Sequence, residues 1–233
     1  MNNSVQKIVD VASAEVGYLE KSKIAYTKNP AVIFEKTAGA GRDNITKYGY
    51  EMHKLSPAVM DFPAAWCDCF VDWCFMKAYG IEQAKQMLGG RFDDYTVNSC
   101  GLYKKMNALG KIPKVGAQVF FTKNGKVDGC YHTGLVVAVD TAHFYTIEGN
   151  TSSVSTVVAN GGAVAKKKYS IAKYANRVLF GYPKYAEKES NDIIARQVLK
   201  GLWGSGEERK KRLSEAGYNY ADVQKNVNAL LGR

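Results

Sequence analysis

Four side chains in three separate segments of the chain have the types and spacing that nucleophilic catalysis needs. Cys67 opens an aromatic-rich stretch with helical spacing, and the first turn of a helix favours the nucleophilic thiolate. His132 opens a strand-like segment, and an imidazole beside a thiol can take its proton and return it to a leaving amine. Glu148 and Asn150 are two residues apart, so on an extended chain they share a face, and one of them could orient the His132 ring.

The five cysteines allow other interpretations. Small buried cysteines are common, and Cys69 would face a different side of a helix from Cys67, so we expect only one of the two in a cleft. The alternative is a zinc site built from these two cysteines, Cys130 and His132. The Cys-x-Cys and Cys-x-His pairs do not match the usual zinc spacing, so we expect no metal and no cofactor. An odd cysteine count also argues against a disulfide scaffold.

The elements that must position these residues can be inferred from the pattern. Apolar spacing predicts a helix from Cys67 to Tyr79 that Gly80 closes, and an earlier helix that Ser4 caps. Alternation of polar and apolar residues predicts strands at 118–122, 131–140 and 144–148, with a turn at 140–143. Helices followed by a mainly antiparallel sheet indicate an α+β domain over residues 1–185.

The pattern changes near the C-terminus. Residues 183–190 are polar and lack apolar periodicity, so we place a linker there. Three short helices are expected in 191–233, and the second has a capping box formed by Ser205 and Glu208. We therefore predict a small three-helix bundle as a second domain at 191–233.

Charge and hydropathy limit the partners. The formal net charge is +10, with 23 Lys/Arg against 15 Asp/Glu in residues 1–186 and nine against seven in 187–233. Such a balance suits polyanions, which include nucleic acid, anionic membranes and the wall of a Gram-positive cell. No nucleic-acid recognition motif and no apolar run long enough for membrane insertion is found. The first residues do not have the pattern of a signal peptide, so we expect the protein in a cytoplasm until it is released to the cell wall.

Three blocks of the chain resemble the CHAP family of peptidoglycan-cleaving cysteine amidases and endopeptidases. They are Trp66-Cys67 with Phe70-Val71 and Trp73, then His132-Thr133-Gly134, then 147–151, Ile-Glu-Gly-Asn-Thr. The resemblance implies a papain-like fold with Cys67 as nucleophile, His132 as base, Glu148 as the group that orients His132, and Asn150 as a fourth polar member. It also suggests that Trp66 contacts substrate.

The chain departs from this family at two places. Gly116-Ala117 stands where similar sequences often have Gly-Asp, which puts a local hydrogen bond in doubt but not the catalytic set. No Asp-rich loop precedes Cys67 like the calcium loop of some relatives, so calcium is not carried over.

Residues 194–228 resemble the CW_7 wall-binding repeat of phage lysins. The resemblance rests on a run of small, aromatic and charged positions that includes Trp203-Gly204, 206–209 (Gly-Glu-Glu-Arg), 216–218 (Ala-Gly-Tyr) and Tyr220. It implies recognition of the muropeptide glycan, with Trp203, Tyr218 and Tyr220 as contacts, although these rings would equally suit the core of a small bundle. A single copy suggests weak binding unless chains self-associate through the bundle.

Together these features predict a phage endolysin that cleaves an amide bond of Gram-positive peptidoglycan by a Cys/His/Glu thiol mechanism. The bond is either the N-acetylmuramoyl-L-alanine amide or a peptide bond of the crosslink, since both present a carbonyl to the same nucleophile. The alternatives are a bacterial autolysin of the same chemistry and a catalytically inactive wall-binding protein.

Overall fold

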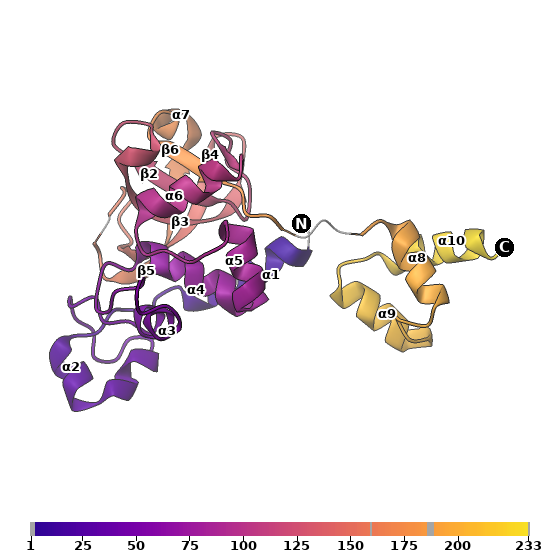
Figure 1. Cartoon of the computed structure of the whole chain (residues 1–233), viewed down its shortest axis with the longest axis horizontal. Coiled ribbons are helices and arrows are strands. Elements are labelled where there is room, and N and C mark those ends of the chain that lie inside the picture. The colour runs from indigo at the N-terminus through magenta and orange to yellow at the C-terminus, as the bar shows by residue number, and fades with distance from the viewer. Residues whose placement is uncertain (1–2, 159, 186–188, 233) are drawn as a thin grey trace. The chain divides into compact units, whose positions relative to one another are not determined.

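The computed structural model describes residues 3–158, 160–185 and 189–232 (Figure 1). Its backbone contacts divide the chain into Lys7–Lys184 and a second unit of Tyr185–Arg233 with Met1–Gln6. We call the first the catalytic unit, because it contains the candidate catalytic residues Cys67 and His132, and residues 189–232 the helical unit. Each is described by itself. Of the linker expected at 183–190, residues 186–188 lie outside the described part of the chain.

Helices make up most of the N-terminal half. They are α1 (Asn3–Glu15), α2 (Lys23–Lys28), the 3-10 helix η1 (Pro30–Phe34), α3 (Lys47–Leu55), α4 (Cys67–Tyr79), α5 (Ile81–Leu88) and α6 (Thr96–Lys105). The predicted helix from Cys67 to Tyr79 is confirmed, and Gly80 ends it at a φ of 80°, which an L side chain rarely adopts. The predicted cap at Ser4 is wrong, because α1 begins at Asn3 and Ser4 lies inside it.

An antiparallel sheet follows. Its strands are β1 (Leu109–Gly110), β2 (Gln118–Thr122), β3 (Cys130–Val139), β4 (His143–Thr151), β5 (Ala163–Ser170) and β6 (Val178–Gly181). The strand order is β1-β6-β2-β3-β4-β5, with every neighbouring pair antiparallel. At the turn between β3 and β4, the Asp140 carboxylate accepts the N–H groups of Ala142 and His143 at 2.8 and 2.7 Å. The predicted α+β class and this hairpin are confirmed.

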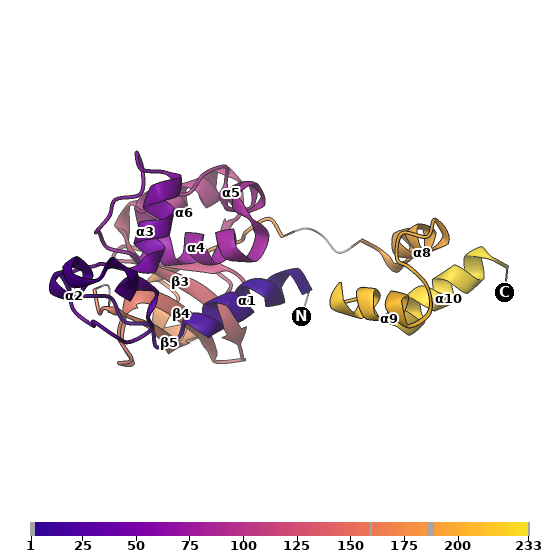
Figure 2. The same cartoon turned by 90° about the horizontal axis from the view of Figure 1, so that it is seen from below.

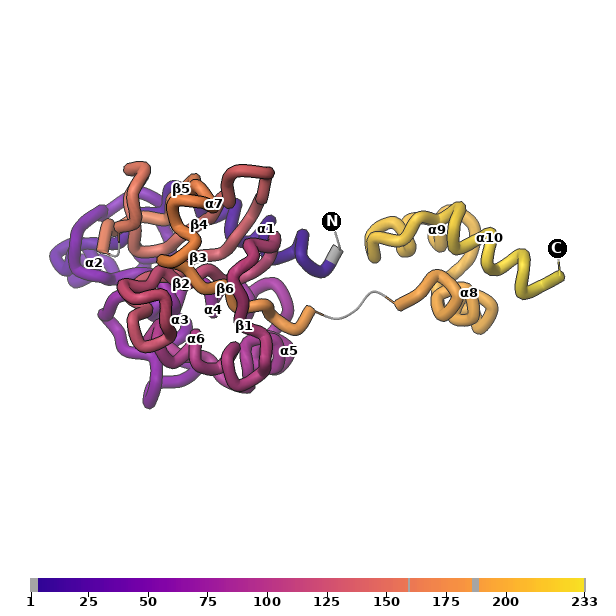
Figure 3. The backbone as a smooth tube through the Cα atoms, turned by 90° about the horizontal axis from the view of Figure 1, so that it is seen from above, coloured from indigo at the N-terminus to yellow at the C-terminus, as the bar shows by residue number. Residues whose placement is uncertain are grey.

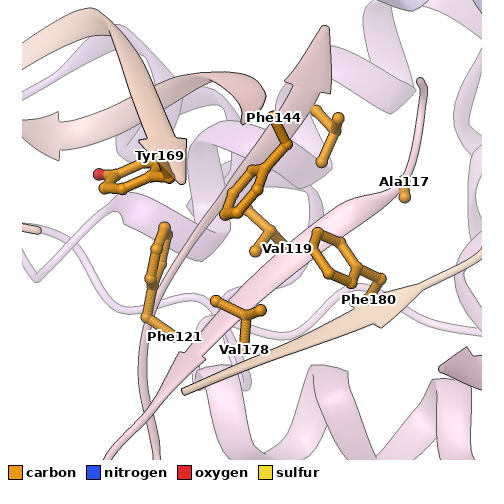
Figure 4. Close-up of a cluster of buried hydrophobic side chains, with 8 residues drawn as sticks. Ala117, Val119, Phe121, Phe144, Tyr169, Val178 and Phe180 are labelled. Atoms are coloured by element: carbon orange, nitrogen blue, oxygen red, sulfur yellow. The ribbon is translucent and has the colours of Figure 1, made fainter. Parts of the chain in front are cut away.

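Helix α4 packs against β3 and β4, as Figure 2 shows. Residues 67–75 of α4 are all buried, Asp68 and Asp72 included, so this part of the helix lies within the core. A second set of buried side chains joins β2, β3, β4, β5 and β6 (Figure 4); it comprises Ala117, Val119, Phe121, Val136, Phe144, Tyr169, Val178 and Phe180. The 3-10 helix η2 (Val127–Gly129) lies between β2 and β3, and α7 (Ile171–Tyr174) follows β5.

The helical unit contains α8 (Asn191–Leu199), α9 (Gly206–Glu215) and α10 (Tyr220–Leu230), which Figure 3 shows as three short coils. Its core is formed by Ile194, Ala195, Val198, Leu213, Tyr218, Val223 and Val227. The expected three helices are present, but the capping box is wrong. Ser205 precedes α9, but its side chain makes no cap bond. Glu208, the other member of the predicted box, pairs with Arg212 one turn later.

Among the described residues, no helix combines the length and the apolar character that a membrane span requires.

Candidate active site

Cys67 is the first residue of α4 and lines a cleft of about 430 Å³. The first hydrogen bond of the helix runs from the Phe70 N–H to the Trp66 carbonyl at 2.9 Å. The N–H groups of a first helical turn have no carbonyl partner within the helix. These N–H groups and the helix dipole would stabilise a thiolate at Cys67, and also an oxyanion that forms beside it.

His132 and Glu148 form a fully buried pair on adjacent strands. His132 Nε2 lies 2.9 Å from Glu148 Oε2, and both side chains have no exposed surface. The Glu148 carboxylate also accepts the hydroxyls of Thr146 and Tyr169, and the His132 ring stacks on Phe121 at 5.7 Å between centroids. The imidazole is therefore fixed in position and in tautomer, as expected for a ring that another group orients.

The second ring nitrogen of His132 is the one available to the thiol. No other described side chain or backbone group is hydrogen-bonded to Nδ1, and Cys67 lies close enough to interact with the ring. The pKa of His132 is raised to about 9. Burial alone would lower this pKa, but the neighbouring Cys67 thiol and Glu148 carboxylate together raise it by more. A ring that retains its proton beside Cys67 can pass that proton to a leaving amine.

Two glycines make room for this arrangement. Leu135 of β3 pairs with Ile147 of β4, which sets Gly134 beside Glu148. A Cβ at Gly134 would lie 2.4 Å from Glu148 Cγ, so only glycine lets this side chain lean toward His132. A Cβ at Gly149 would lie 2.6 Å from Phe70 Cβ, which explains the close approach of β4 to α4. The glycines of the two sequence blocks thus have a packing reason.

Asn150 follows on the same strand but does not join the hydrogen-bonded pair. It is buried, its φ is 52°, and neither polar atom of its amide has a partner among the described residues. Its backbone carbonyl accepts the Gly161 N–H at 2.9 Å. Glu148 is therefore hydrogen-bonded to His132, whereas Asn150, on the same strand, is a buried amide without a partner among the described residues.

Trp66 lies in the core beneath Cys67. The ring is 1% exposed, stacks on Tyr48 at 5.5 Å between centroids, and donates its Nε1–H to the buried Glu20 at 2.8 Å. A ring that is covered on this scale offers substrate almost no surface. We therefore assign Trp66 to the packing that holds the start of α4, rather than to the substrate contact expected from the sequence.

Sequence reasoning missed a buried hydrogen-bond chain beside the site. Gln118 Nε2 donates to Asp68 Oδ1 at 2.8 Å and to Thr133 Oγ1 at 3.1 Å. Asp68 follows Cys67 and Thr133 follows His132, so the chain ties together the neighbours of both reactive residues. Burial raises the pKa of Asp68 to about 7, and hydrogen bonds from Ser99 and Gln118 offset part of this effect. The two aspartates in an otherwise largely apolar helix, Asp68 and Asp72, were the available signal.

The cleft lining was also missed. Tyr95 and Tyr131 are 57% and 39% exposed, and they line the cleft with Lys123, Asp94 and Asp128. Tyr131 could have been noticed because it precedes His132. The others lie in connections whose spacing gives no signal, and only the fold brings them to Cys67.

The remaining cysteines are buried thiols. Burial raises the pKa of Cys69 well above its usual value, and the nearby Asp72 adds to this, so the thiol stays protonated. Cys74 and Cys100 likewise have raised pKa values, the first through burial and the second chiefly through a hydrogen bond with Cys130. Within residues 3–158, 160–185 and 189–232, no group of three or more His, Cys, Asp or Glu side chains is placed to hold a metal ion.

Comparison with protein families matches two segments of the chain. The model of the CHAP domain matches residues 59–150, a range that contains Cys67, His132, Glu148 and Asn150. The CHAP match begins in the loop before α4 and ends on β4, so it spans the segments that carry the candidate catalytic residues.

A second family model, the CW_7 repeat, matches residues 192–231 of the helical unit. There Trp203 and Tyr218 make an edge-to-face contact with centroids 5.9 Å apart, and Trp203 donates its Nε1–H to Gln197 at 2.9 Å. Tyr218 is buried, whereas Trp203 and Tyr220 are half-buried against the core. Trp203 also lines a hollow of about 510 Å³ with Leu202 and other residues. The three rings predicted to bind glycan thus all contribute to packing.

Solved structures and curated proteins add less. Two structures of Ly7917 are similar, one of them described as holding the hydrolysing product of MDP. Their identities are 15% and 14%, and their TM-scores are 0.36 and 0.34. In both cases the match covers 77% of this chain and 62% of the other chain, so this chain spans less than two thirds of their length. No curated protein matches this chain.

Proposed function

We propose that this chain is a cysteine-dependent peptidoglycan hydrolase that cuts an amide bond of the bacterial wall. The observation that carries the proposal is the buried His132–Glu148 pair, whose free ring nitrogen serves a cysteine at the start of α4. The match to the CHAP domain over the same residues supports it. The CW_7 match indicates that the helical unit holds the enzyme on its insoluble substrate.

The geometry suggests a two-step reaction. The Cys67 thiolate attacks the amide carbonyl, and N–H groups of the first turn of α4 stabilise the oxyanion. His132 gives its proton to the leaving amine as the C–N bond breaks, and the acyl group remains on Cys67 as a thioester. Neutral His132 then takes a proton from water, the resulting hydroxide displaces the thiolate, and the new carboxylate leaves. Glu148 holds the ring in place throughout.

The finer assignment is a phage endolysin that acts on Gram-positive walls, either as an N-acetylmuramoyl-L-alanine amidase or as a peptide endopeptidase. Two features support it: the CW_7 match, since this repeat resembles those of phage lysins, and the surplus of positive charge on residues 1–186. Anionic polymers of such walls would attract the catalytic unit by long-range electrostatics.

The test is a digest of purified Gram-positive walls, analysed by mass spectrometry of the released fragments. The proposal predicts one new amine and one new carboxylate per cut, and the fragment masses identify the bond. Prior alkylation of the protein should abolish the cut, as should Cys67→Ser. Release of reducing sugar ends without new amines would instead indicate a glycosidase and contradict the proposal.

A further inference from the structure

A second hollow, of about 700 Å³, lies next to the catalytic cleft. The C-terminal half of α6 forms one wall, with Lys104, and the β2–β3 connection forms another, with Lys126. Asp128 lines both the hollow and the cleft, and the adjacent residues Thr96 and Val97 of α6 line one each. The hollow therefore continues the cleft that contains Cys67.

The two lysines of this hollow have no ion-pair partner among the described residues. Both Lys104 and Lys126 are exposed. The Asp128 carboxylate is held by the Asn124 amide at 3.0 Å instead. The backbone of Lys126 is fixed, since its N–H donates to Asn124 Oδ1 and its carbonyl accepts the Thr122 hydroxyl. Two ammonium groups are thus presented from rigid elements.

The rest of the lining indicates the kind of ligand. Val97, Leu109, Val127 and Leu179 provide apolar surface, and Asn107 adds an amide. No aromatic side chain lines the hollow, whereas sugar rings commonly pack on aromatic faces such as those of Tyr95 and Tyr131 in the cleft. Apolar walls with two cations suit a short peptide that carries carboxylates and small aliphatic side chains.

We propose that the α6 hollow is a subsite for the stem peptide of peptidoglycan, in which Lys104 and Lys126 bind its carboxylates. This assignment rests on the proposed function, because it extends the cleft of Cys67 to the substrate beyond the scissile amide. It adds a specificity determinant: walls whose stem-peptide carboxylates are amidated should bind more weakly than walls in which they are free.

The test uses the full chain and one preparation of soluble muropeptides. Half of the preparation is treated with carbodiimide and ammonium, so that its carboxylates become carboxamides. Binding to the Cys67→Ser protein is measured by calorimetry, with and without Lys104→Ala and Lys126→Ala. Lys105→Ala is the matched control, because Lys105 lies in the same last turn of α6, is exposed and does not line the hollow.

We expect each lysine substitution to raise the Kd for untreated muropeptides about 5-fold, and both together about 20-fold. Amidation should raise the Kd of the Cys67→Ser protein with both lysines present by a similar factor. With amidated muropeptides, the lysine substitutions should then cause no further rise in Kd. Lys105→Ala should bind like its parent. The inference is overturned if the lysine substitutions have no effect, if they weaken the binding of both preparations equally, or if neither preparation binds.

Turnover by the chain with Cys67 intact separates this result from the proposed function. If fragments are released while the lysine substitutions leave binding unchanged, the hydrolase assignment stands and the subsite fails. If the lysines bind carboxylates but no amide is cut, the subsite stands and the hydrolase assignment fails.

Discussion

The two units of this chain hold their candidate functional side chains in different ways. In the catalytic unit, His132 and Glu148 are brought together by strand pairing across 16 residues and are fully buried. In the helical unit, Trp203 and Tyr218 meet within a local bundle, where Tyr218 is buried and Trp203 keeps part of its surface accessible. Catalysis needs groups fixed by long-range contacts and shielded from water, whereas a wall anchor needs exposed surface on a small stable scaffold.

Charge differs between the two units as well. Residues 1–186 carry 23 Lys/Arg against 15 Asp/Glu, whereas residues 187–233 are nearly balanced at nine against seven. Long-range attraction to anionic walls should therefore come from the catalytic unit, and specific retention from the helical unit.

The largest effect should follow removal of the nucleophile. Cys67→Ala and His132→Ala should each reduce hydrolysis by at least about 10³-fold, since members of one catalytic unit fail together. Wall binding, measured by co-sedimentation, should be unchanged. Cys69→Ser is the matched control two residues away and should keep most of the activity. An inactive Cys69→Ser beside an active Cys67→Ser would exchange their roles.

Loss of the orienting carboxylate should be milder and should change the pH profile. Glu148→Gln should lower turnover by about 100-fold. The proton on His132 is lost as the pH rises through about 9, so activity should fall there. Glu148 is one of the groups that raise the pKa of His132, so its removal should move this alkaline limb to lower pH. A pH–rate profile checks both points; an unmoved limb would separate Glu148 from His132.

Removal of the helical unit should lower activity on intact walls but not on soluble wall fragments. A chain that ends at residue 185 should lose about 10²-fold in activity on intact walls, because tethering raises the effective concentration of the enzyme at its substrate. The same chain should cleave soluble fragments as well as the full chain does. The two rates are compared side by side, and an equal loss on both substrates would show that the helical unit supports catalysis rather than binding.

The glycine beside Glu148 allows a smaller and sharper test. Gly134→Ala should reduce turnover by about 10-fold, since the added Cβ would displace Glu148. Gly101→Ala on α6 is the matched control, because its Cβ meets no atom within 4 Å. Alanine there should preserve activity and stabilise the helix by about 0.5–1 kcal/mol. Equal activity of the two variants would contradict the packing argument.

The smallest effect concerns stability. Folding raises the pKa of Asp68 to about 7, so the folded protein keeps the Asp68 proton to a higher pH than the unfolded chain does. The stability of the fold therefore falls as the pH rises toward 7. Asp68→Asn removes the buried charge but keeps an acceptor for Gln118. It should raise the melting temperature at pH 8, by roughly 2–4 °C for each kcal/mol gained, and much less at pH 5. An equal shift at both pH values would mean that Asp68 is not ionised in the fold.

Much of this architecture could be predicted from the sequence. Helical periodicity indicated α4 and the three helices of the helical unit, and alternation indicated β2, β3 and β4. Strand β5 was missed because three consecutive lysines, 166–168, interrupt its apolar pattern. Lys167 is nonetheless buried there, since its ammonium donates to the Ser152 and Thr156 carbonyls at 2.8 and 2.6 Å. A local pattern cannot reveal a partner that only the fold supplies.

The candidate site shows the same limit. The residue types at Cys67, His132 and Glu148 indicated the chemistry, but three features depend on register and loop placement. These are the hydrogen bond of His132 to Glu148 rather than Asn150, which the residue spacing alone left open and the family resemblance anticipated, the burial of Trp66, and the meeting of Tyr95 with Tyr131 in one cleft. Each arises from contacts between distant segments, and the sequence of one segment does not indicate which other segment it contacts.

The central claim is that Cys67 attacks the wall amide and carries the acyl group. Its most direct test is acid quenching of the full chain during the digestion of wall fragments, followed by protease mapping and mass spectrometry. The account predicts a thioester on the peptide that contains Cys67, at the mass of the acyl fragment, which disappears when quenching is delayed. Continued turnover with the acyl group on another residue, or with no covalent adduct while Cys67→Ala stays active, would contradict it.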